Sequence, residues 1–238
     1  MKILRWVWLA LTLGLLGYAF HQGMYVAPTE ATMGDIQRIF YYHFPSAMLT
    51  FLFFFISFVA SIVYLASRRN NPQRALSADA AALAGAEMGV IFCTVVLIQG
   101  PLWARPVWGI WWTWDARLTT TLLLWLIYTS YLLLRRFAAG PQMQTLAAVL
   151  AIFGYLDVPI VYFSTRWWRT QHPAPVIGGD ANSGLDPAMW PAVLWNLAAW
   201  LAWGIMIAGW RYSIERRRQI AEQHAALHAL EASLEVTL

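Results

Sequence analysis

The run PSAMLTFLFFFISFVASIVYLA, residues 45–66, contains no charged side chain and no strand-like alternation of polar and apolar residues. The hydrocarbon core of a bilayer is about 30 Å thick, and roughly 20 apolar residues in an α-helix are needed to cross it. Only helices and closed barrels satisfy their backbone hydrogen bonds in lipid. A long apolar run without alternation is therefore predicted to be a transmembrane helix.

Five further apolar runs lie on either side of this one. They are predicted to span the membrane at residues 4–20, 80–102, 118–134, 146–163 and 190–210. The first has a basic front, as a signal peptide does, but no convincing cleavage site follows it, so we interpret it as a retained span. Apolar residues make up 60% of the 238 positions and charged residues only 12%, and the mean hydropathy is +0.51. The predicted fold class is an all-α integral membrane protein with six transmembrane helices.

Six spans place the connecting segments alternately on the two sides of the membrane. Eleven of the 16 Lys and Arg residues fall on the side that also carries both termini. Because cytoplasmic loops are enriched in Lys and Arg, both termini are predicted to be cytoplasmic and the long tryptophan-rich loops periplasmic. The net charge of +4 thus reflects topology, and no nucleic acid partner is expected. We divide the chain into a membrane domain, 1–212, and a cytoplasmic amphipathic tail, 213–238, that docks on a partner or on membrane lipid.

The most unusual loop reads WGIWWTWDARLTTT, residues 108–121. An aromatic belt would decorate both membrane interfaces, yet nine tryptophans lie near the predicted outer face and only three near the inner one. Trp108, Trp111 and Trp112 are spaced i, i+3 and i+4, which predicts a short interfacial helix with all three on one face. Together with Trp114 they would form a flat platform for a planar aromatic ligand. Two more tryptophans near this face are further candidates: Trp167 and Trp168.

Charged residues border the predicted platform. Asp115 directly precedes the fourth span, where its carboxylate is expected to cap the helix N-terminus. Capping would not exclude a second role at the ligand. Guanidinium groups bind carboxylates through paired hydrogen bonds, so the arginines of the outer side are candidates for an anionic ligand, the alternative being solvated loop charges. These arginines are Arg117, Arg38, Arg105, Arg166 and Arg169.

Two histidines, His43 and His172, lie in predicted outer loops that precede and follow the tryptophan motif in the sequence. A single histidine near an interface is more often packed or solvated. Two neutral imidazoles from separate loops could instead supply both axial ligands of a heme iron. No cluster of Cys, His and acidic residues offers zinc four ligands, and His21 is a spare candidate ligand.

Ionisable residues also occur within the predicted spans, where they are functional candidates. Asp157, beside Pro159, could line the floor of an outer site, satisfy backbone groups freed at the proline, or pair with a basic residue of a neighbouring helix. Glu87 lies within the third span. The single cysteine, Cys93, excludes an intrachain disulfide, and the lack of a CxxC motif argues against a thiol oxidoreductase.

The motif WGIWWTWDARLT, the segment GDIQRIFYYHFPSA around His43 and the segment YFSTRWWRTQH around His172 resemble the cytochrome c maturation protein C family (CcmC, heme exporter protein C), which carries the tryptophan-rich WWD motif. The resemblance covers nearly the whole chain. Larger relatives that ligate heme to apocytochromes typically continue this motif as WDPxE, whereas Asp115 is followed here by Ala-Arg-Leu-Thr, which favours the smaller C component. The resemblance implies b-type heme, held non-covalently and in transit at the outer face, with axial ligation by His43 and His172.

The resemblance also implies a cellular setting and partners. These are the bacterial inner membrane, the periplasmic heme chaperone CcmE that receives the heme, the small subunit CcmD, and the ABC-type subunits CcmA and CcmB. We therefore expect a heme-handling component rather than an enzyme, although it could promote covalent attachment of heme to the chaperone. The alternatives are a heme-transporting permease subunit, which should have a polar path at depth, and a scaffold of the transporter complex.

Overall fold

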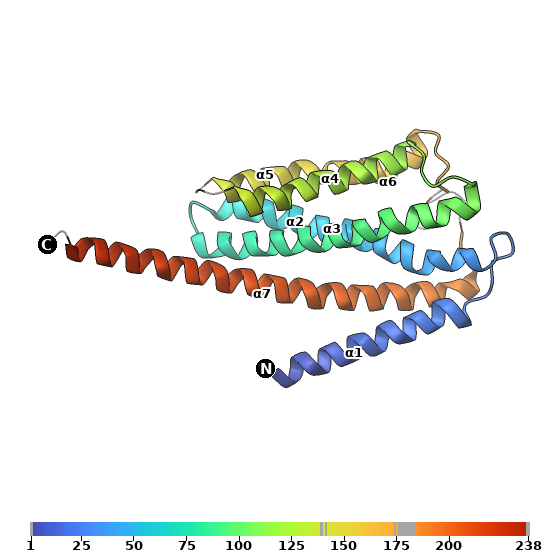
Figure 1. Cartoon of the computed structure of the whole chain (residues 1–238), viewed down its shortest axis with the longest axis horizontal. Helices are drawn as coiled ribbons and strands as arrows, with labels where there is room; N and C mark the ends of the chain where they lie inside the picture. The colour runs from blue at the N-terminus through green and yellow to red at the C-terminus, as the bar shows by residue number, and fades with distance from the viewer. Residues whose placement is uncertain (1, 139, 141, 174, 176–183, 237–238) are drawn as a thin grey trace.

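The computed structural model describes residues 2–138, 140, 142–173, 175 and 184–236. These residues form an all-helical bundle (Figure 1). Six helical segments are long and apolar enough to cross a membrane: Ile3–Val26, Asp35–Ser67, Pro72–Trp108, Ala116–Phe137, Met143–Trp167 and Pro187–Ala232. The all-helical fold and the six predicted spans are thereby confirmed, each at its predicted place in the chain.

The helices begin and end at local signals in the sequence. Their bounds are α1 Lys2–His21, η1 Gln22–Val26, η2 Asp35–Ile39, α2 Phe40–Ser67, α3 Pro72–Trp108, α4 Ala116–Phe137, α5 Met143–Tyr155, α6 Asp157–Trp167, η3 Pro187–Met189 and α7 Trp190–Val236. Asn71 starts α3 by accepting a hydrogen bond from the Arg74 amide, and Pro72 fits the first helical position because its missing N–H is not needed there. Gly109 ends the same helix with a φ of 78°, which glycine adopts without steric cost.

Helices α2 and α3 are antiparallel and make the most extensive contact between two helices, so this pair forms the centre of the bundle. Their backbones approach closely at Gly85, where an added Cβ would lie 2.9 Å from both the Phe53 carbonyl oxygen and the Ser57 amide nitrogen. Around this pair, Phe54 of α2 stacks on Tyr128 of α4 with ring centroids 3.8 Å apart. The small residue at position 85 therefore sets the distance between the two central helices.

Replacing Gly85 by alanine is expected to destabilise the protein by about 1–3 kcal/mol, the usual cost of overpacking a core. The new methyl group would meet backbone atoms, which cannot rotate away as a side chain can. The measurement is thermal unfolding in detergent, followed by tryptophan fluorescence. The control is Gly14→Ala on α1, where nothing lies within 4 Å of the added Cβ. That substitution should leave stability unchanged or raise it slightly, and equal effects at both positions would contradict the close approach.

A buried polar cluster, consisting of Asp79, Arg135, Glu215 and Gln219, joins α3 and α4 to α7. The Arg135 guanidinium forms two bonds to the Asp79 carboxylate, at 2.5 and 3.0 Å, and a third to Glu215 at 3.4 Å. Gln219 donates to the second Asp79 oxygen at 3.1 Å. The side chains of the three charged residues are 3–8% exposed. The polar cluster therefore fixes the position of α7 in the bundle.

Glu87, the ionisable residue noted in the third span, has a partner of its own. Its carboxylate accepts two hydrogen bonds of 2.6 Å from Arg211 on α7. Both side chains are partly exposed. This ion pair makes a second polar link between α3 and α7 and gives Glu87 a structural role.

The fifth span is present but consists of two helices, α5 and α6, that are interrupted at Leu156. Pro159 has no N–H with which to bond the carbonyl of Tyr155, so the helix cannot continue unbroken through this position. On the two sides of the break the packing differs. The α5 helix packs against both α2 and α4, whereas α6 packs against α4 and α5.

The two terminal helices lie at one side of the bundle. Figure 1 shows α7 as the longest helix, with α1 against it and diverging from it toward the N-terminus. The diverging part of α1 exposes large apolar side chains such as Leu4 and Trp6, as expected of a surface that faces lipid. The segment predicted as a tail from residue 213 is helical and continues α7 without interruption as far as Val236. Positions 237–238 of that tail lie outside the described residues.

Candidate functional site

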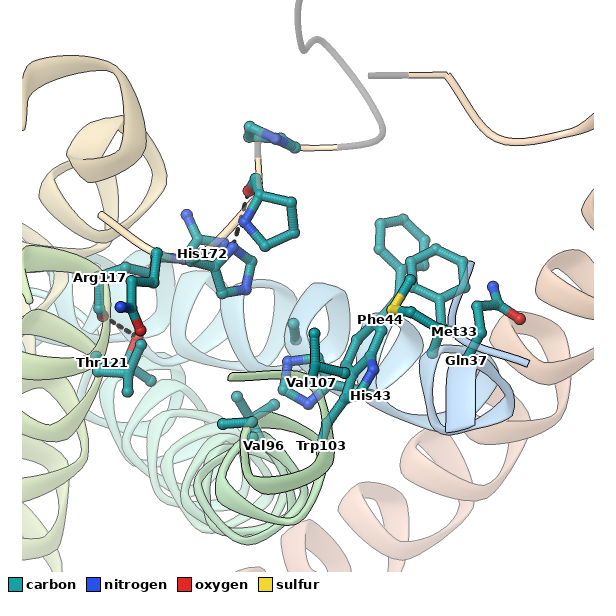
Figure 2. A pocket seen from close by; sticks show the side chains of 18 of the residues that line it. Met33, Gln37, His43, Phe44, Val96, Trp103, Val107, Arg117, Thr121 and His172 are labelled. Atoms are coloured by element: carbon teal, nitrogen blue, oxygen red, sulfur yellow. Dashed lines mark hydrogen bonds between the residues drawn. The ribbon is translucent and has the colours of Figure 1, made fainter. Parts of the chain in front are cut away.

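A cavity of about 1090 Å³ lies between α2, α3, α4 and α6. His43 and His172, the two histidines predicted as ligands, both line it. Figure 2 shows them approaching the cavity from different elements, His43 from α2 and His172 from the segment after α6. Apolar side chains make up most of the wall, and its polar groups include both imidazoles and Arg117. The structure therefore brings together two residues that are 129 positions apart in the sequence.

His43 lies in the first turn of α2, where its ring packs edge-on against Trp103 with centroids 5.9 Å apart. Its Nδ1 atom is buried and has no hydrogen-bond partner among the described residues. A buried polar atom without a partner carries an energetic cost, and such atoms are frequently explained by function. The His43 imidazole is thus held by packing at the cavity wall, and its Nδ1 atom is unpaired among the described residues.

His172 is held by its own backbone. Its Nδ1 lies 2.9 Å from the Pro173 carbonyl oxygen, so an Nδ1–H group donates there and leaves the lone pair of Nε2 free. Burial, and then the nearby Arg117 guanidinium, lower the pKa of His172 to about 4. The ring is therefore neutral at physiological pH, which is the form that coordinates a metal.

Asp115 caps α4, as predicted, because its Oδ1 accepts a hydrogen bond of 3.0 Å from the Leu118 amide. The second carboxylate oxygen has another function. It accepts hydrogen bonds from the backbone amide of Gln171 at 3.2 Å and from the Thr113 hydroxyl at 3.3 Å. Since Gln171 immediately precedes His172, this hydrogen bond connects the segment that carries His172 to the start of α4. Asp115 itself is absent from the cavity wall.

The short helix predicted for Trp108, Trp111 and Trp112 is wrong. Residues 110–115 are not helical, because Gly109 takes a positive φ and ends α3 immediately after Trp108. Trp108 and Trp112 line the cavity, whereas Trp111 and Trp114 are not part of its wall and are 56% and 75% exposed. The motif therefore divides into two cavity residues and two surface residues.

Sequence reasoning missed the contribution of α3 upstream of the motif. Gly100, Trp103, Ala104 and Val107 line the cavity, and their spacing of three and four residues places them on one helix face. Continuing the helical spacing backward from Trp108 would have identified this face. Trp103 has a buried Nε1 without a partner among the described residues, as does Trp112. Two residues of the wall thus carry indole N–H groups that are unpaired among the described residues.

Of the five outer arginines, Arg117 alone lines the described cavity. Its Nη1 donates to the Val161 carbonyl at 2.8 Å and to the Tyr162 carbonyl at 3.3 Å, both on α6. These two hydrogen bonds hold the Arg117 guanidinium at the cavity wall. At this position the guanidinium can meet an anionic ligand.

The other predicted arginines have different surroundings. Arg38 donates hydrogen bonds to Asp35, to the carbonyls of Gly23 and Ala27, and to the Thr29 hydroxyl. Arg105 donates to the Gly109 carbonyl. Arg166 lies over the rings of Tyr162 and Phe163, and Arg169 is exposed. Arg38 therefore fastens η1 and the following turn to η2.

The remaining candidates lie outside the cavity wall. Trp167 and Trp168 are exposed beyond it, with the Trp167 ring stacked on Phe163 at 5.3 Å. Asp157 lies at the start of α6 and is buried. Its Oδ2 has no partner in the described part of the chain, so it pairs with no basic residue through this oxygen.

Comparison with known proteins adds an independent finding. Residues 1–226 match the family described as CcmC, heme exporter protein C. The chain is 36% identical to heme exporter protein C of Bradyrhizobium diazoefficiens over 91% of this chain and 81% of that protein. It is 30% identical to heme exporter protein C of Escherichia coli K12, over 82% and 71% of the two chains. A putative cytochrome c biosynthesis ccmC-like mitochondrial protein of Arabidopsis thaliana is 32% identical, over 84% and 72%.

Proposed function

The chain belongs to the heme exporter protein C family, and from this premise we propose that it handles heme for cytochrome c maturation, holding the heme in the cavity between His43 and His172. The observation that carries this proposal is the meeting of two imidazoles from separate elements at one cavity, with Nε2 of His172 left free and Nδ1 of His43 unpaired among the described residues. Two neutral imidazoles are a common axial ligand set for heme iron. The protein supplies positioning and electrostatics, with no conventional catalytic group.

The wall fits a flat amphipathic ligand. A volume of about 1090 Å³ is slightly above the usual range for small-molecule pockets, roughly 300–1,000 Å³, so a porphyrin has room. Trp103, Trp108 and Trp112 supply aromatic surface. Arg117 offers charge to a carboxylate. When bound, the heme iron supplies the coordination chemistry, and these residues orient the porphyrin around it.

Residues outside the wall are given supporting roles. Asp115 positions the His172 segment through Gln171. Seven exposed residues are proposed to surround the outer side of the site and to contact the partner that receives the heme. They are Trp111, Trp114, Trp167, Trp168, Arg105, Arg166 and Arg169. In this proposal that partner is the chaperone CcmE. Asp157 and Arg38 are assigned structural roles in the fold and no contact with the heme.

The proposed setting follows the charge distribution and the family. The cavity faces the periplasm, both termini are in the cytoplasm, and the protein lies in the bacterial inner membrane. CcmD, CcmA and CcmB are the proposed membrane and ATPase partners, and the amphipathic segment from residue 213 is available to them. A permease would need a polar path through the bilayer. The described cavity instead reaches Cys93 on α3 and stops short of Glu87.

Heme titration into the purified protein in lipid nanodiscs tests the proposal. We expect saturable binding of one heme with the absorption bands of a low-spin, bis-imidazole iron. Transfer to purified CcmE should then remove the heme from this chain and load the chaperone. A protein that retains its helical circular dichroism but shows no saturable heme spectrum would rule out the function.

Heme affinity is expected to be constant from about pH 8 to about pH 5.5 and to fall as the pH approaches 4, because only the neutral His172 ring coordinates iron. The folded-state pKa of about 4 lies below the ordinary 6.5. The contribution of this group to folded stability is therefore complete above about pH 6.5 and is lost as the pH falls through the folded pKa. The measurement is heme dissociation followed at the Soret band.

Arg117→Gln provides the comparison for this pH profile. The charged groups facing His172 are Arg117 and Asp115, with His43 across the cavity. Because Arg117 lowers the pKa of His172, its removal should move the fall in affinity to higher pH. A wild-type profile that already falls near pH 6.5 would show that His172 is not held neutral.

A further inference from the structure

The break in the fifth span leaves a gap in the half of the bundle that holds the histidines. On the N-terminal side of the break, α5 lies between α2 and α4 and packs against both. Beyond it, α6 stays with α4 and makes no comparable packing with α2. Figure 1 shows α6 running beside α4. The space over α3 that α5 covers in one half of the bundle is therefore left open between α2 and α6 in the other.

The cavity extends along this gap into the apolar part of the helices. On α2 its lining runs from Phe40 to Phe51, which is about 16 Å at 1.5 Å per residue. That distance is about half of a 30 Å hydrocarbon core. Met48, in the middle of this stretch, is 37% exposed although it lines the cavity. The cavity wall thus includes an accessible side chain at the depth of the lipid chains.

The cavity wall changes in polarity along its length. Polar side chains occur at the outer end, where α4 begins and α6 ends: His43, His172, Arg117, Gln171 and Asp186. The inner part is lined mostly by apolar side chains, namely Ala47, Met48, Phe51, Val96, Leu97 and Leu124. Thr50 and Thr121 also line it, and their hydroxyls donate to carbonyls of their own helices. A ligand with an apolar body and a charged edge would match this gradient, just as it matches a lipid leaflet with its headgroups.

We propose that the gap between Ala47 and Met48 of α2 and Val161 and Tyr162 of α6 is a lateral opening, through which heme dissolved in the bilayer moves sideways to His43 and His172. This inference rests on the proposed function. All four residues line the cavity. Heme that moves sideways keeps its porphyrin in an apolar medium throughout, so the cost of exposing it to water is avoided.

Arg117 stands at the edge of this opening. The guanidinium is bonded to the carbonyls of Val161 and Tyr162, which belong to the α6 side of the gap. It extends from the first turn of α4, at the level where that helix meets the interface. Heme carboxylates remain near the headgroups while the ring lies in lipid, so Arg117 is placed to receive them without a change of depth.

The experiment measures how fast heme reaches the protein from lipid. The protein is reconstituted in phosphatidylcholine vesicles preloaded with heme, an excess of apomyoglobin in the water captures heme that leaves the bilayer, and growth of the low-spin spectrum is followed. Wild type is expected to load despite the scavenger. Met48→Trp, which narrows the gap, should load at least tenfold more slowly than wild type. Met48→Ala should load at least as fast as wild type.

The matched control is Val59→Trp, on the same helix and with a similar exposure of 40%, but outside the cavity wall. It should load like wild type. If apomyoglobin abolishes loading of the wild type, heme arrives through water and the lateral opening is refuted. Equal rates for Met48→Trp and Val59→Trp would also refute it. A wild type that shows no low-spin heme from lipid or from water would instead overturn the proposed function itself.

Discussion

Replacing both His43 and His172 by alanine is expected to abolish the low-spin heme spectrum and to lower heme affinity by at least about 100-fold. Loss of a group that only supports a metal ligand typically costs 10–100-fold in metal affinity, and here both ligands themselves are removed. The apolar wall and Arg117 stay in place, so weak binding through porphyrin burial is expected to persist with a high-spin spectrum. Absorption spectra and heme titration of the nanodisc-embedded protein measure both effects.

The single variants and a matched double variant complete this test. His43→Ala and His172→Ala should each give a five-coordinate, high-spin heme, and added imidazole should restore the low-spin spectrum by filling the vacated position. His224→Ala with His228→Ala removes two exposed histidines of α7 and should change nothing. A low-spin spectrum in the double variant at His43 and His172 would mean that the iron has other ligands.

Sequence alone predicted the features that depend on local patterns. Apolar runs located all six spans, because lipid requires helices of a minimum length. The position of Asp115 before an apolar run predicted its capping role, since helix caps are decided by neighbouring residues. The two histidines were identified as a pair from their positions in predicted outer loops, and both line one cavity, although His43 lies in the first turn of α2 and not in a loop.

Other features depend on how distant segments meet, and these were not predictable in the same way. The cavity exists because α6 departs from α2 after the break at Leu156, which sets the relative position of three helices. The predicted helix for Trp108, Trp111 and Trp112 failed because helical spacing was applied across Gly109, whose positive φ ends α3. Asp79 and Glu215 are far apart in sequence, so their shared partner Arg135 could not be inferred from spacing.

Arg135→Leu is expected to destabilise the protein by about 3–5 kcal/mol, because breaking a buried ion pair from one side leaves an uncompensated charge. Here two carboxylates, those of Asp79 and Glu215, would lose their shared partner while remaining buried. We expect α7 to loosen first, since Glu215 and Gln219 hold it to α3 and α4. Thermal unfolding in detergent and the rate of proteolysis beyond residue 213 measure these effects.

The charge imbalance, rather than the lost contacts, should dominate this effect, and a triple variant separates the two. Asp79→Leu, Arg135→Met and Glu215→Leu together remove every charge of the buried pairs, and such replacements are often neutral or stabilising. The triple variant should therefore be more stable than Arg135→Leu alone. Glu222→Ala, which removes the exposed partner of Arg218, should cost at most about 1 kcal/mol. Asp79 lies 14 residues before Cys93 on α3, about 21 Å from the inner end of the cavity. Folded Arg135→Leu protein should thus keep its low-spin heme spectrum, and loss of heme at unchanged stability would contradict a purely structural role.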